Sequence, residues 1–312
     1  MCVWGEVLPT HGEMELNSHM NLFVQQLITG LSIGAVYALL AVGYALIYSI
    51  FKFTNFAFGA IMMCAAYGAY FLVTKLGFTS LWAGLLGAVI FGVAVSLLTE
   101  LAAYRSLRKK KAARLYLMIA AMGVNIFLQN FMTVMLGANV KALRLDLPIG
   151  SMAIGNIHVG ATDILSLLIS LLSLAILWYF LDRTRQGMAV RASAIDTDTA
   201  GLMGVNVNMI SLIVFAISGL TAAVAGTFIG MKYTVYPTMG AISNKAFISS
   251  VIGGLGSLQG AVVGGFILGV LETMISGYIS STYRDLFAYG IMIVVLVFAP
   301  NGLLGKKVQD KL

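Results

Sequence analysis

The chain has 312 residues, of which 60% are hydrophobic and only 10% are charged, and its formal net charge is +7. Because soluble domains carry about 25% charged residues, this composition excludes an ordinary soluble protein and predicts a domain whose main solvent is lipid. The basic residues cluster in a few short segments between apolar stretches, so the positive charge does not indicate a nucleic-acid-binding surface.

The first nineteen residues contain no Lys or Arg. A secretory signal peptide needs a basic start and an apolar core, so this stretch is not one. Met20, followed by NLFVQQLITG, is a more usual start for a membrane protein. We therefore expect residues 1–19 to be a poorly ordered N-terminal extension or an over-long start, residues 20–305 to form the membrane domain, and residues 306–312 to be a cytoplasmic tail.

Long apolar segments occupy most of the chain. A helix needs about 20 mostly apolar residues to span a bilayer, and the sequence predicts an all-α, polytopic bundle with about eight transmembrane helices. The predicted spans are Leu22–Phe51, Phe56–Val73, Leu81–Tyr104, Leu115–Leu136, Ile164–Leu181, Met209–Met231, Leu258–Tyr278 and Leu286–Ala299. The first is longer than one crossing requires and carries Gly30, Gly34 and Gly43, so we expect it to be tilted or broken.

Two Gly-rich breaks interrupt the apolar pattern. Ala246–Ile252 is too short to span and precedes GGLGS, which predicts a re-entrant half-helix. A second break lies at residues 52–60, between the first two spans. Transporters place substrate sites at broken helices, while small residues also serve close helix packing. Packing is the preferred interpretation for Gly264–Gly269, and both interpretations stay open for Asn55. The candidates for the translocation path are Asn55, Gly59, Gly253, Gly254, Gly256 and Ser257.

The distribution of basic residues predicts the orientation. Residues 105–114 hold six Lys or Arg, residues 183–191 hold three, and the C-terminal tail holds three. Because such residues concentrate in cytoplasmic segments, we expect these three segments inside, residues 1–20 outside, and residues 138–162 as the largest outer loop.

One polar segment, residues 182–208, separates two long spans and reads DRTRQGMAVRASAIDTDTAGLMGVNVN. Its small residues and charges predict a short helix that docks onto a soluble partner and ends at Gly204. Ala200 and Gly204 are one helical turn apart, so a partner groove could close over them. The alternative is an ordinary solvated loop of mixed charge. The candidate docking residues are Gly187, Arg191, Ala192, Asp196, Ala200, Gly204 and Asn206.

Glu272 lies inside a predicted span, where a carboxylate is costly and indicates function or pairing. Lys245 and Arg284 are its candidate partners. A secondary transporter would couple to an ion and would be expected to carry paired intramembrane acids, whereas Glu272 stands nearly alone.

Enzyme and metal motifs do not fit this chain. Residues 30–34 match G-x-S-x-G in letters, but that motif needs a strand-to-helix elbow and here lies inside an apolar helix. The sequence has no HExxH motif and no phosphate-binding G-x4-G-K-[ST] loop. Cys2 and Cys64 lie far apart and predict no disulfide framework or metal site. We therefore expect no catalytic residue, metal site or cofactor in this chain.

Several motifs in the same order resemble those of LivH-type permeases, which belong to ATP-binding-cassette (ABC) importers of branched-chain amino acids. The segment RASAIDTDTAGLMGVNVNMISLIVFAISGLTAAVAG resembles their coupling loop and following helix. GLSIGAVYALLAVGYALIYSI and TNFAFGAIMMCAAYGAY resemble their first helix and Asn-Phe-Ala motif. AYRSLR resembles the end of their third helix, VIGGLGSLQGAVVGGFILGVLE their Gly-rich turn, and APNGLLG their C-terminal signature. The resemblance covers roughly residues 20–305.

The resemblance implies a translocation subunit that works by alternating access in a bacterial inner membrane. It implies a second homologous permease, two ATPase subunits that bind ATP and Mg, a solute-binding protein, and Leu, Ile or Val as substrate. Close relatives are similar to urea and amide importers, which stay open as an alternative. This chain departs from the family at Phe58, where His is frequent, at Ser106, where Pro is frequent, and at Ala299, where Arg is frequent. Phe58 removes a polar group beside Asn55 and argues against substrate binding at that position.

Overall fold

The computed structural model describes residues 11–77, 79–110, 112–148, 150, 152–154 and 157–305. Within these residues it contains eight helices that are long and apolar enough to cross a membrane, which confirms the predicted all-α bundle. They are α1 (His11–Phe51), α2 (Phe58–Leu76), α3 (Leu81–Thr99), α5 (Arg114–Leu136), α6 (Ala161–Arg183), α9 (Val207–Tyr233), α11 (Leu258–Tyr278) and α12 (Arg284–Phe298).

Shorter elements connect these helices. They are the π-helical turn η1 (Glu100–Tyr104), α4 (Arg105–Lys109), α7 (Arg185–Ile195), α8 (Thr197–Leu202), the 3₁₀ turn η2 (Met239–Ile242), α10 (Ser243–Gly253), the 3₁₀ turn η3 (Ser281–Tyr283), and the strands β1 (Met152–Ile154) and β2 (Ile157–Val159). The strands pair as an antiparallel hairpin, Met152 opposite Val159. The sequence analysis did not predict this hairpin, which lies in the expected outer loop.

The predicted span Leu81–Tyr104 is longer in the structure and takes in part of the basic segment 105–114. Helix α3 continues through η1 and α4 as one rod that ends at Lys109. Arg, Leu and Lys are strong helix formers, so the charged residues extend the helix beyond its apolar part.

Helix α1 is unbroken, and its glycines serve packing. A Cβ atom built at Gly269 of α11 would lie 2.3 Å from the Cα of Gly34, and one at Gly265 would lie 2.4 Å from the Cα of Ala38. The two backbones approach this closely only because both helices carry small residues at the contact. The preferred packing interpretation of residues 264–269 is therefore confirmed.

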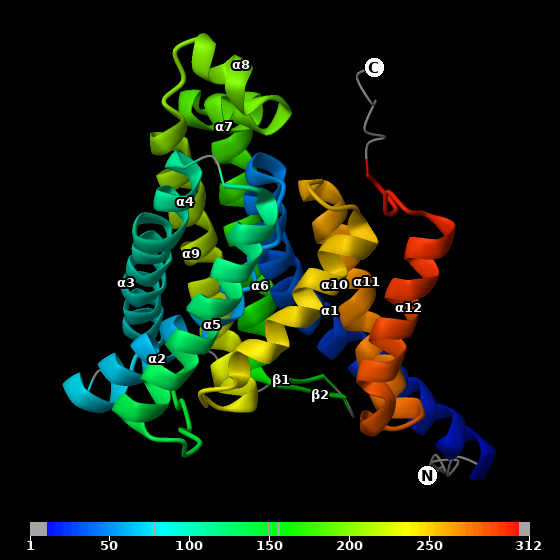
Figure 1. Ribbon diagram of the computed structural model, residues 1–312. Helices are drawn as coiled ribbons and strands as arrows, with labels where there is room; N and C mark the ends of the chain where they lie inside the picture. The colour runs from blue at the N-terminus through cyan, green and yellow to red at the C-terminus, as the bar shows by residue number, and fades with distance from the viewer. Residues whose placement is uncertain are drawn as a thin grey trace, which may run out of the picture.

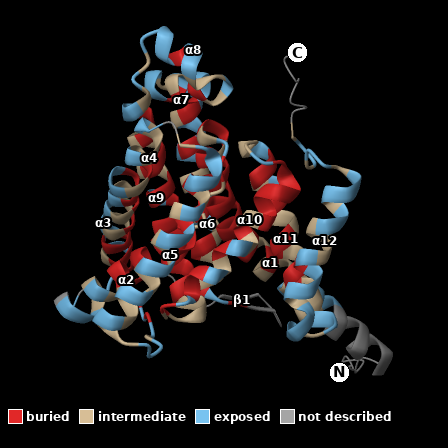
Figure 2. Ribbon diagram, in the orientation of Figure 1, coloured by how far each residue is buried: buried red, intermediate tan, exposed pale blue. Residues whose placement is uncertain are grey.

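The core lies around α1, α2 and α9. In the most hydrophobic part of each helix, 94% of the residues are buried in α1, 11% in α5 and 6% in α12. Figure 2 shows the same division, with buried residues in the centre and exposed residues on α3, α5 and α12. In an aqueous protein these exposed apolar faces would be unfavourable, whereas in a bilayer they match the lipid.

Figure 1 shows α4, α7 and α8 at one end of the bundle and the β1–β2 hairpin at the other. We call these the basic end and the hairpin end. Both described basic segments therefore lie on one side, as the predicted orientation requires. Helix α1 already begins at His11, while residues 1–10 and 306–312 lie outside the described residues. The expected extension and tail stay predictions.

Candidate translocation and coupling site

The polar segment 182–208, called the coupling segment below, forms two short helices instead of the single one expected. A side-chain cap begins each helix. Thr184 Oγ1 accepts from the Gly187 backbone N–H at 3.0 Å, and Asp196 Oδ1 accepts from the Asp198 and Thr199 N–H groups at 3.0 and 3.2 Å. Asn206 caps α9 in the same way. Each cap satisfies backbone donors that a helix start leaves open, so Asp196 and Asn206 shape the segment.

Gly204 ends α8, as predicted. Its φ is +89°, a conformation that glycine adopts without steric cost. The Val205 N–H donates to Ala200 O and the Gly204 N–H donates to Gly201 O, both at 3.1 Å. These two bonds form a Schellman motif, which closes the last helical turn.

The expectation that a partner groove closes over Ala200 is wrong. Ala200 is buried, and a Cβ at Gly187 would lie 2.3 Å from Phe180 O, so both small residues pack the segment onto its own chain. The exposed surface of the segment is mixed, and its most exposed large apolar side chains are Ile195, Leu202 and Met203, at 88%, 89% and 82%. Sequence reasoning missed these residues, although apolar side chains inside a polar segment were the available signal.

The other predicted docking residues lie at the surface. Ala192 and Gly204 are exposed. Arg191 is half-exposed and forms an ion pair with Asp182 at 2.7 Å, which ties α7 to the end of α6. A half-exposed pair of this kind contributes little to stability.

The coupling segment also contacts the end of α1. Lys52 Nζ donates to Ala194 O at 3.4 Å, and Thr197 Oγ1 donates to Ile50 O at 3.5 Å. Partial burial, and next the charge of Arg114, lowers the pKa of Lys52. Helices α7 and α8 therefore lie directly on the junction between α1 and α2.

That junction, residues 52–57, is called the corner below. Lys52 has φ +52°, which is unusual for a residue with a side chain. Asn55 is 1% exposed, and its Oδ1 accepts from the Ala57 N–H at 3.1 Å and from Tyr104 Oη at 2.6 Å. Its Nδ2 is buried and has no hydrogen-bond partner among the residues that the structure describes. Asn55 therefore holds the corner in shape through its carboxamide oxygen.

Beyond the corner, α2 begins against the re-entrant helix. A Cβ at Gly59 would lie 2.4 Å from both Gly240 O and Ser243 Oγ. Tyr44 Oη and Ser243 Oγ are 3.2 Å apart, and the Phe56 and Phe247 rings lie 6.1 Å apart. We call the four residues Tyr44, Phe56, Phe58 and Phe247 the aromatic cluster. The ring centroids of Tyr44 and Phe58 are 4.7 Å apart, and those of Tyr44 and Phe247 are 6.0 Å apart. Phe58 fills this space with an apolar ring.

The predicted half-helix is present as α10. It ends where Gly254 and Gly256 have φ of +112° and +86°. Its open carbonyl groups are covered by the segment after α12, because the Leu303 N–H donates to Ile252 O at 2.9 Å and the Leu304 N–H donates to Gly253 O at 3.0 Å. This is the protein cover that a helix end at membrane depth requires.

The six path candidates therefore fall into two groups. Asn55 in the corner and Gly59 at the start of α2 form the first group, and Gly253, Gly254, Gly256 and Ser257 at the end of α10 form the second. A Cβ atom built at Gly256 would lie 3.4 Å from Tyr48 Cδ1 and 3.7 Å from Ser49 Cα, so the second group lies beside the end of α1 that leads into the corner. Gly253 packs on Gly260, and Ser257 Oγ caps α11 by accepting from the Gly260 N–H at 3.1 Å. Both groups are therefore closely packed within the chain, and their assignment to the translocation path stays a prediction.

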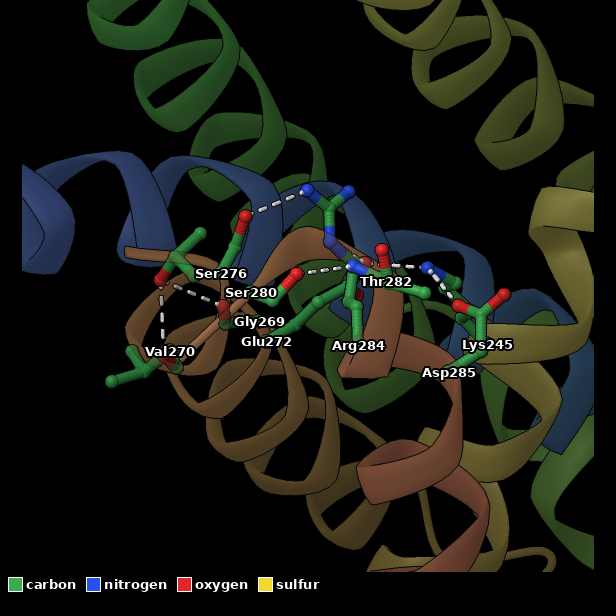
Figure 3. A network of polar contacts seen from close by, with 10 residues as sticks. Lys245, Gly269, Val270, Glu272, Ser276, Ser280, Thr282, Arg284 and Asp285 are labelled. Carbon is green, nitrogen blue, oxygen red and sulfur yellow. Dashed lines mark hydrogen bonds and ion pairs between the residues drawn. The ribbon is translucent and has the colours of Figure 1, made fainter. Parts of the chain in front are cut away.

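Glu272 is paired, as expected. Its Oε1 contacts Lys245 Nζ and lies 3.3 Å from Arg284 Nε, and Lys245 Nζ lies 2.9 Å from Asp285 Oδ1. Figure 3 shows these groups converging from three helices, Lys245 from α10, Glu272 from α11, and Arg284 with Asp285 from α12. Glu272 is 2% exposed. The network links the half-helix to the two helices that follow it.

A second ion pair joins three helices near the hairpin end. Lys232 Nζ of α9 lies 2.6 Å from Asp163 Oδ1 of α6, which also accepts from Ser32 Oγ of α1 at 3.1 Å. A small pocket beside this pair is lined mainly by α1 and α9 residues, among them Ile33, Tyr37 and Phe228. Sequence reasoning missed this pair, since its members lie far apart in the chain.

The comparison with protein families decides the class. The family model described as "Branched-chain amino acid transport system / permease component" matches residues 26–296. The chain belongs to this permease family.

Relatives agree over nearly the whole length. The high-affinity branched-chain amino acid transport system permease protein LivH of Escherichia coli is 35% identical over 303 residues, which cover 93% of this chain and 97% of that protein. The corresponding permease protein BraD of Pseudomonas aeruginosa is 35% identical over 302 residues, with 93% and 98% covered.

Solved structures share the fold at low identity. A chain from an inward-facing structure described as a metal-chelate type ABC transporter has a TM-score of 0.52 and 17% identity, covering 96% of this chain and 92% of that chain. PsaBC from Streptococcus pneumoniae has a TM-score of 0.51 and 16% identity, covering 89% and 92%. At such identity the likeness shows the arrangement of the helices alone.

In this permease the motifs that carried the resemblance have structural roles. The Asn-Phe-Ala motif forms the corner and the start of α2, and the C-terminal APNGLLG segment covers the end of α10. Among the described residues, no group of three or more His, Cys, Asp or Glu side chains could hold a metal ion. Apart from Arg183–Asp182 within α6 and Arg108–Glu100 within the rod from Leu81 to Lys109, the ion pairs of the described structure join different helices.

Proposed function

We propose that this chain is the membrane-spanning translocation subunit of an ATP-driven importer of branched-chain amino acids, Leu, Ile or Val. The carrying observation is the capped, apolar-tipped coupling segment, which lies directly on the corner next to the half-helix. Family membership and the named function of the relatives support the substrate class. The site of action is the bacterial inner membrane, with the basic end in the cytoplasm.

The exposed tip of the coupling segment indicates a protein partner. Helices α7 and α8 lie at the basic end (Figure 1), and Ile195, Leu202 and Met203, in or directly after them, are strongly exposed. Exposed apolar surface in water marks interaction sites. The chain has no phosphate-binding loop of its own, so the partners at this end are two ATPase subunits, which bind ATP and Mg.

The remaining partners follow from the same assembly. A second homologous permease completes the translocation path, and a solute-binding protein delivers the amino acid at the hairpin end. Transport proceeds by alternating access, in which ATP binding changes the arrangement of the coupling segment. Such a change shifts the permease only through contacts that differ between its states.

The contact between α2 and α10 is apolar and aromatic. The proposed path opens at this contact, where the aromatic cluster offers an apolar surface to an aliphatic side chain. Asn55, whose Nδ2 has no hydrogen-bond partner among the described residues, directly precedes Phe56 of this cluster in the chain. This combination suits a branched aliphatic zwitterion better than urea, which has no apolar part.

The test is purification from native membranes in mild detergent, followed by reconstitution into vesicles. We expect a second permease and ATPase chains to co-purify, and radiolabelled leucine to accumulate only with ATP and the solute-binding protein present. Uptake of labelled urea in place of leucine would overturn the substrate class.

An ion-coupled secondary transporter is the outcome that would overturn the mechanism. It would purify as a single chain and transport leucine without ATP. The structure gives this alternative little support, because Glu272 is held by two cations and so does not supply a free intramembrane acid.

A further inference from the structure

The π-helical turn η1 interrupts the otherwise regular rod from Leu81 to Lys109. The Arg105 N–H donates to Glu100 O, five residues back. Single π-turns of this kind are rare and are frequent at functional sites. Two residues of the turn, Glu100 and Tyr104, are 0% and 1% exposed. Both make polar contacts with other helices.

Glu100 contacts the helix that leaves the coupling segment. Its Oε1 accepts from Ser211 Oγ of α9 at 2.7 Å and from the Arg108 guanidinium. The same guanidinium donates to Ser211 Oγ and lies 4.8 Å from the ring centroid of Phe51, at the end of α1. Through Glu100, η1 therefore binds Ser211 in the first turns of α9, a few residues after the Asn206 cap.

Tyr104 contacts the corner. Its Oη donates to Asn55 Oδ1 at 2.6 Å, the shorter of the two bonds that this oxygen accepts. Its ring packs on Phe53 of the corner and on Phe215 of α9, with both centroid distances 5.3 Å. The hydrogen bond is buried, so losing the Tyr104 donor leaves Asn55 Oδ1 with the Ala57 N–H alone and no water to replace the lost bond.

The corner itself lies between the coupling segment and the aromatic cluster. Lys52 and Ile50 contact the segment through Ala194 and Thr197, and Phe56, at the other end of the corner, packs on Phe247 of the half-helix. A displacement of α7 and α8 therefore reaches the corner at its first residue, Lys52, while Tyr104 of η1 holds the corner at Asn55.

We infer that Tyr104 is a positioning residue for transport, which acts through Asn55. The hydrogen bond between them fixes the corner to η1, and η1 to α9, so that the coupling segment and the aromatic cluster move together. Without this hydrogen bond the backbone of the corner can change conformation, and movement of the coupling segment no longer displaces Phe56. This inference rests on the proposed function as an ATP-driven importer.

The test compares two Tyr→Phe variants in the reconstituted complex with its partner subunits. Tyr104→Phe removes the donor and keeps the ring. Tyr67→Phe is the matched control, because Tyr67 is 2% exposed in the core of α2 and its hydroxyl has no hydrogen-bond partner among the described residues. We expect labelled leucine uptake per ATP hydrolysed to fall by about two- to tenfold in Tyr104→Phe, the range that one buried hydrogen bond sets. Tyr67→Phe should match the unsubstituted protein.

A double-mutant cycle with Asn55→Ala shows whether Tyr104 acts through Asn55. We expect the double variant to transport no worse than Asn55→Ala alone, because interacting residues do not add. Fully additive losses would overturn the inference. Should Asn55→Ala not assemble, the two Tyr→Phe variants decide.

Two further outcomes have clear meanings. If Tyr104→Phe lowers thermal stability while uptake per ATP stays unchanged, the residue is merely structural and the inference is wrong. If the unsubstituted complex shows no ATP-driven uptake, the proposed function fails instead, independently of Tyr104.

Discussion

At the residue scale, Glu272 carries the charged network between α10, α11 and α12. Glu272→Gln removes the charged partner of Arg284 and leaves Lys245 with the exposed Asp285 alone. Removing one member of a buried ion pair costs about 3 kcal/mol or more. We expect a lower yield and a lower melting temperature in detergent. Asp285→Asn is the matched control, since Asp285 is 68% exposed and surface pairs contribute little. Equal melting temperatures for Glu272→Gln and the unsubstituted protein would contradict the prediction.

Gly204 provides a second test at this scale. Gly204→Arg places a bulky charge beside the exposed tip of α8, and we expect it to reach the membrane while ATP hydrolysis no longer drives uptake. Gly204→Asn is the control, because Asn tolerates a positive φ far better than most residues. Its uptake should stay close to normal. Normal ATP-driven uptake by the Arg variant would show that no partner docks at this position.

At the element scale, the C-terminal segment covers the half-helix, and Gly302 is where the two come closest. A Cβ at Gly302 would lie 2.4 Å from the Cα of Gly254, and its φ is +76°. The left-handed conformation alone costs a side chain about 1–2 kcal/mol. We expect Gly302→Ala to lower the melting temperature and the rate of leucine uptake together.

Gly290 of α12 supplies the matched control for that experiment. A Cβ there would meet nothing within 4 Å, and Ala favours a helix over Gly by about 1 kcal/mol. Gly290→Ala should therefore be neutral or slightly stabilising. If both Gly→Ala variants behave alike, the segment after α12 does not hold the half-helix.

At the scale of the whole molecule, the prediction concerns assembly. Leu202→Asp replaces a side chain that is 89% exposed at the tip of the coupling segment. Buried interface anchors contribute about 2 kcal/mol or more, so we expect co-purification of the ATPase subunits to fall by about tenfold or more. Asn208→Asp adds the same charge at the same end, at a helix N-terminus that tolerates it. Undiminished ATPase recovery with Leu202→Asp would place the docking surface elsewhere.

Much of the fold was readable from the sequence, because bilayer thickness fixes the length of an apolar span. The eight spans and the half-helix were predicted within a few residues of their observed bounds, except that α1 begins at His11 and not at Leu22. The turn at Gly204 was also readable, since a positive φ at a helix end selects for glycine. The structural role of Gly30 and Gly34 could not be predicted, because a small residue suits a bend in a helix and a close helix–helix contact equally well.

The sequence by itself determined the class of protein, its spans, the half-helix and the polar segment 182–208 between two spans, because each depends on local composition and length. Only the tertiary structure decided which residues meet. In the structure Ala200 is buried and Leu202 is exposed. Glu272 forms ion pairs with both of its candidate partners, Lys245 and Arg284. Tyr104 forms a hydrogen bond with Asn55, which lies 49 positions away in the chain. Such pairings depend on which faces of the helices pack against one another. The pattern of apolar residues does not predict these faces, because the lipid and the protein core are equally apolar.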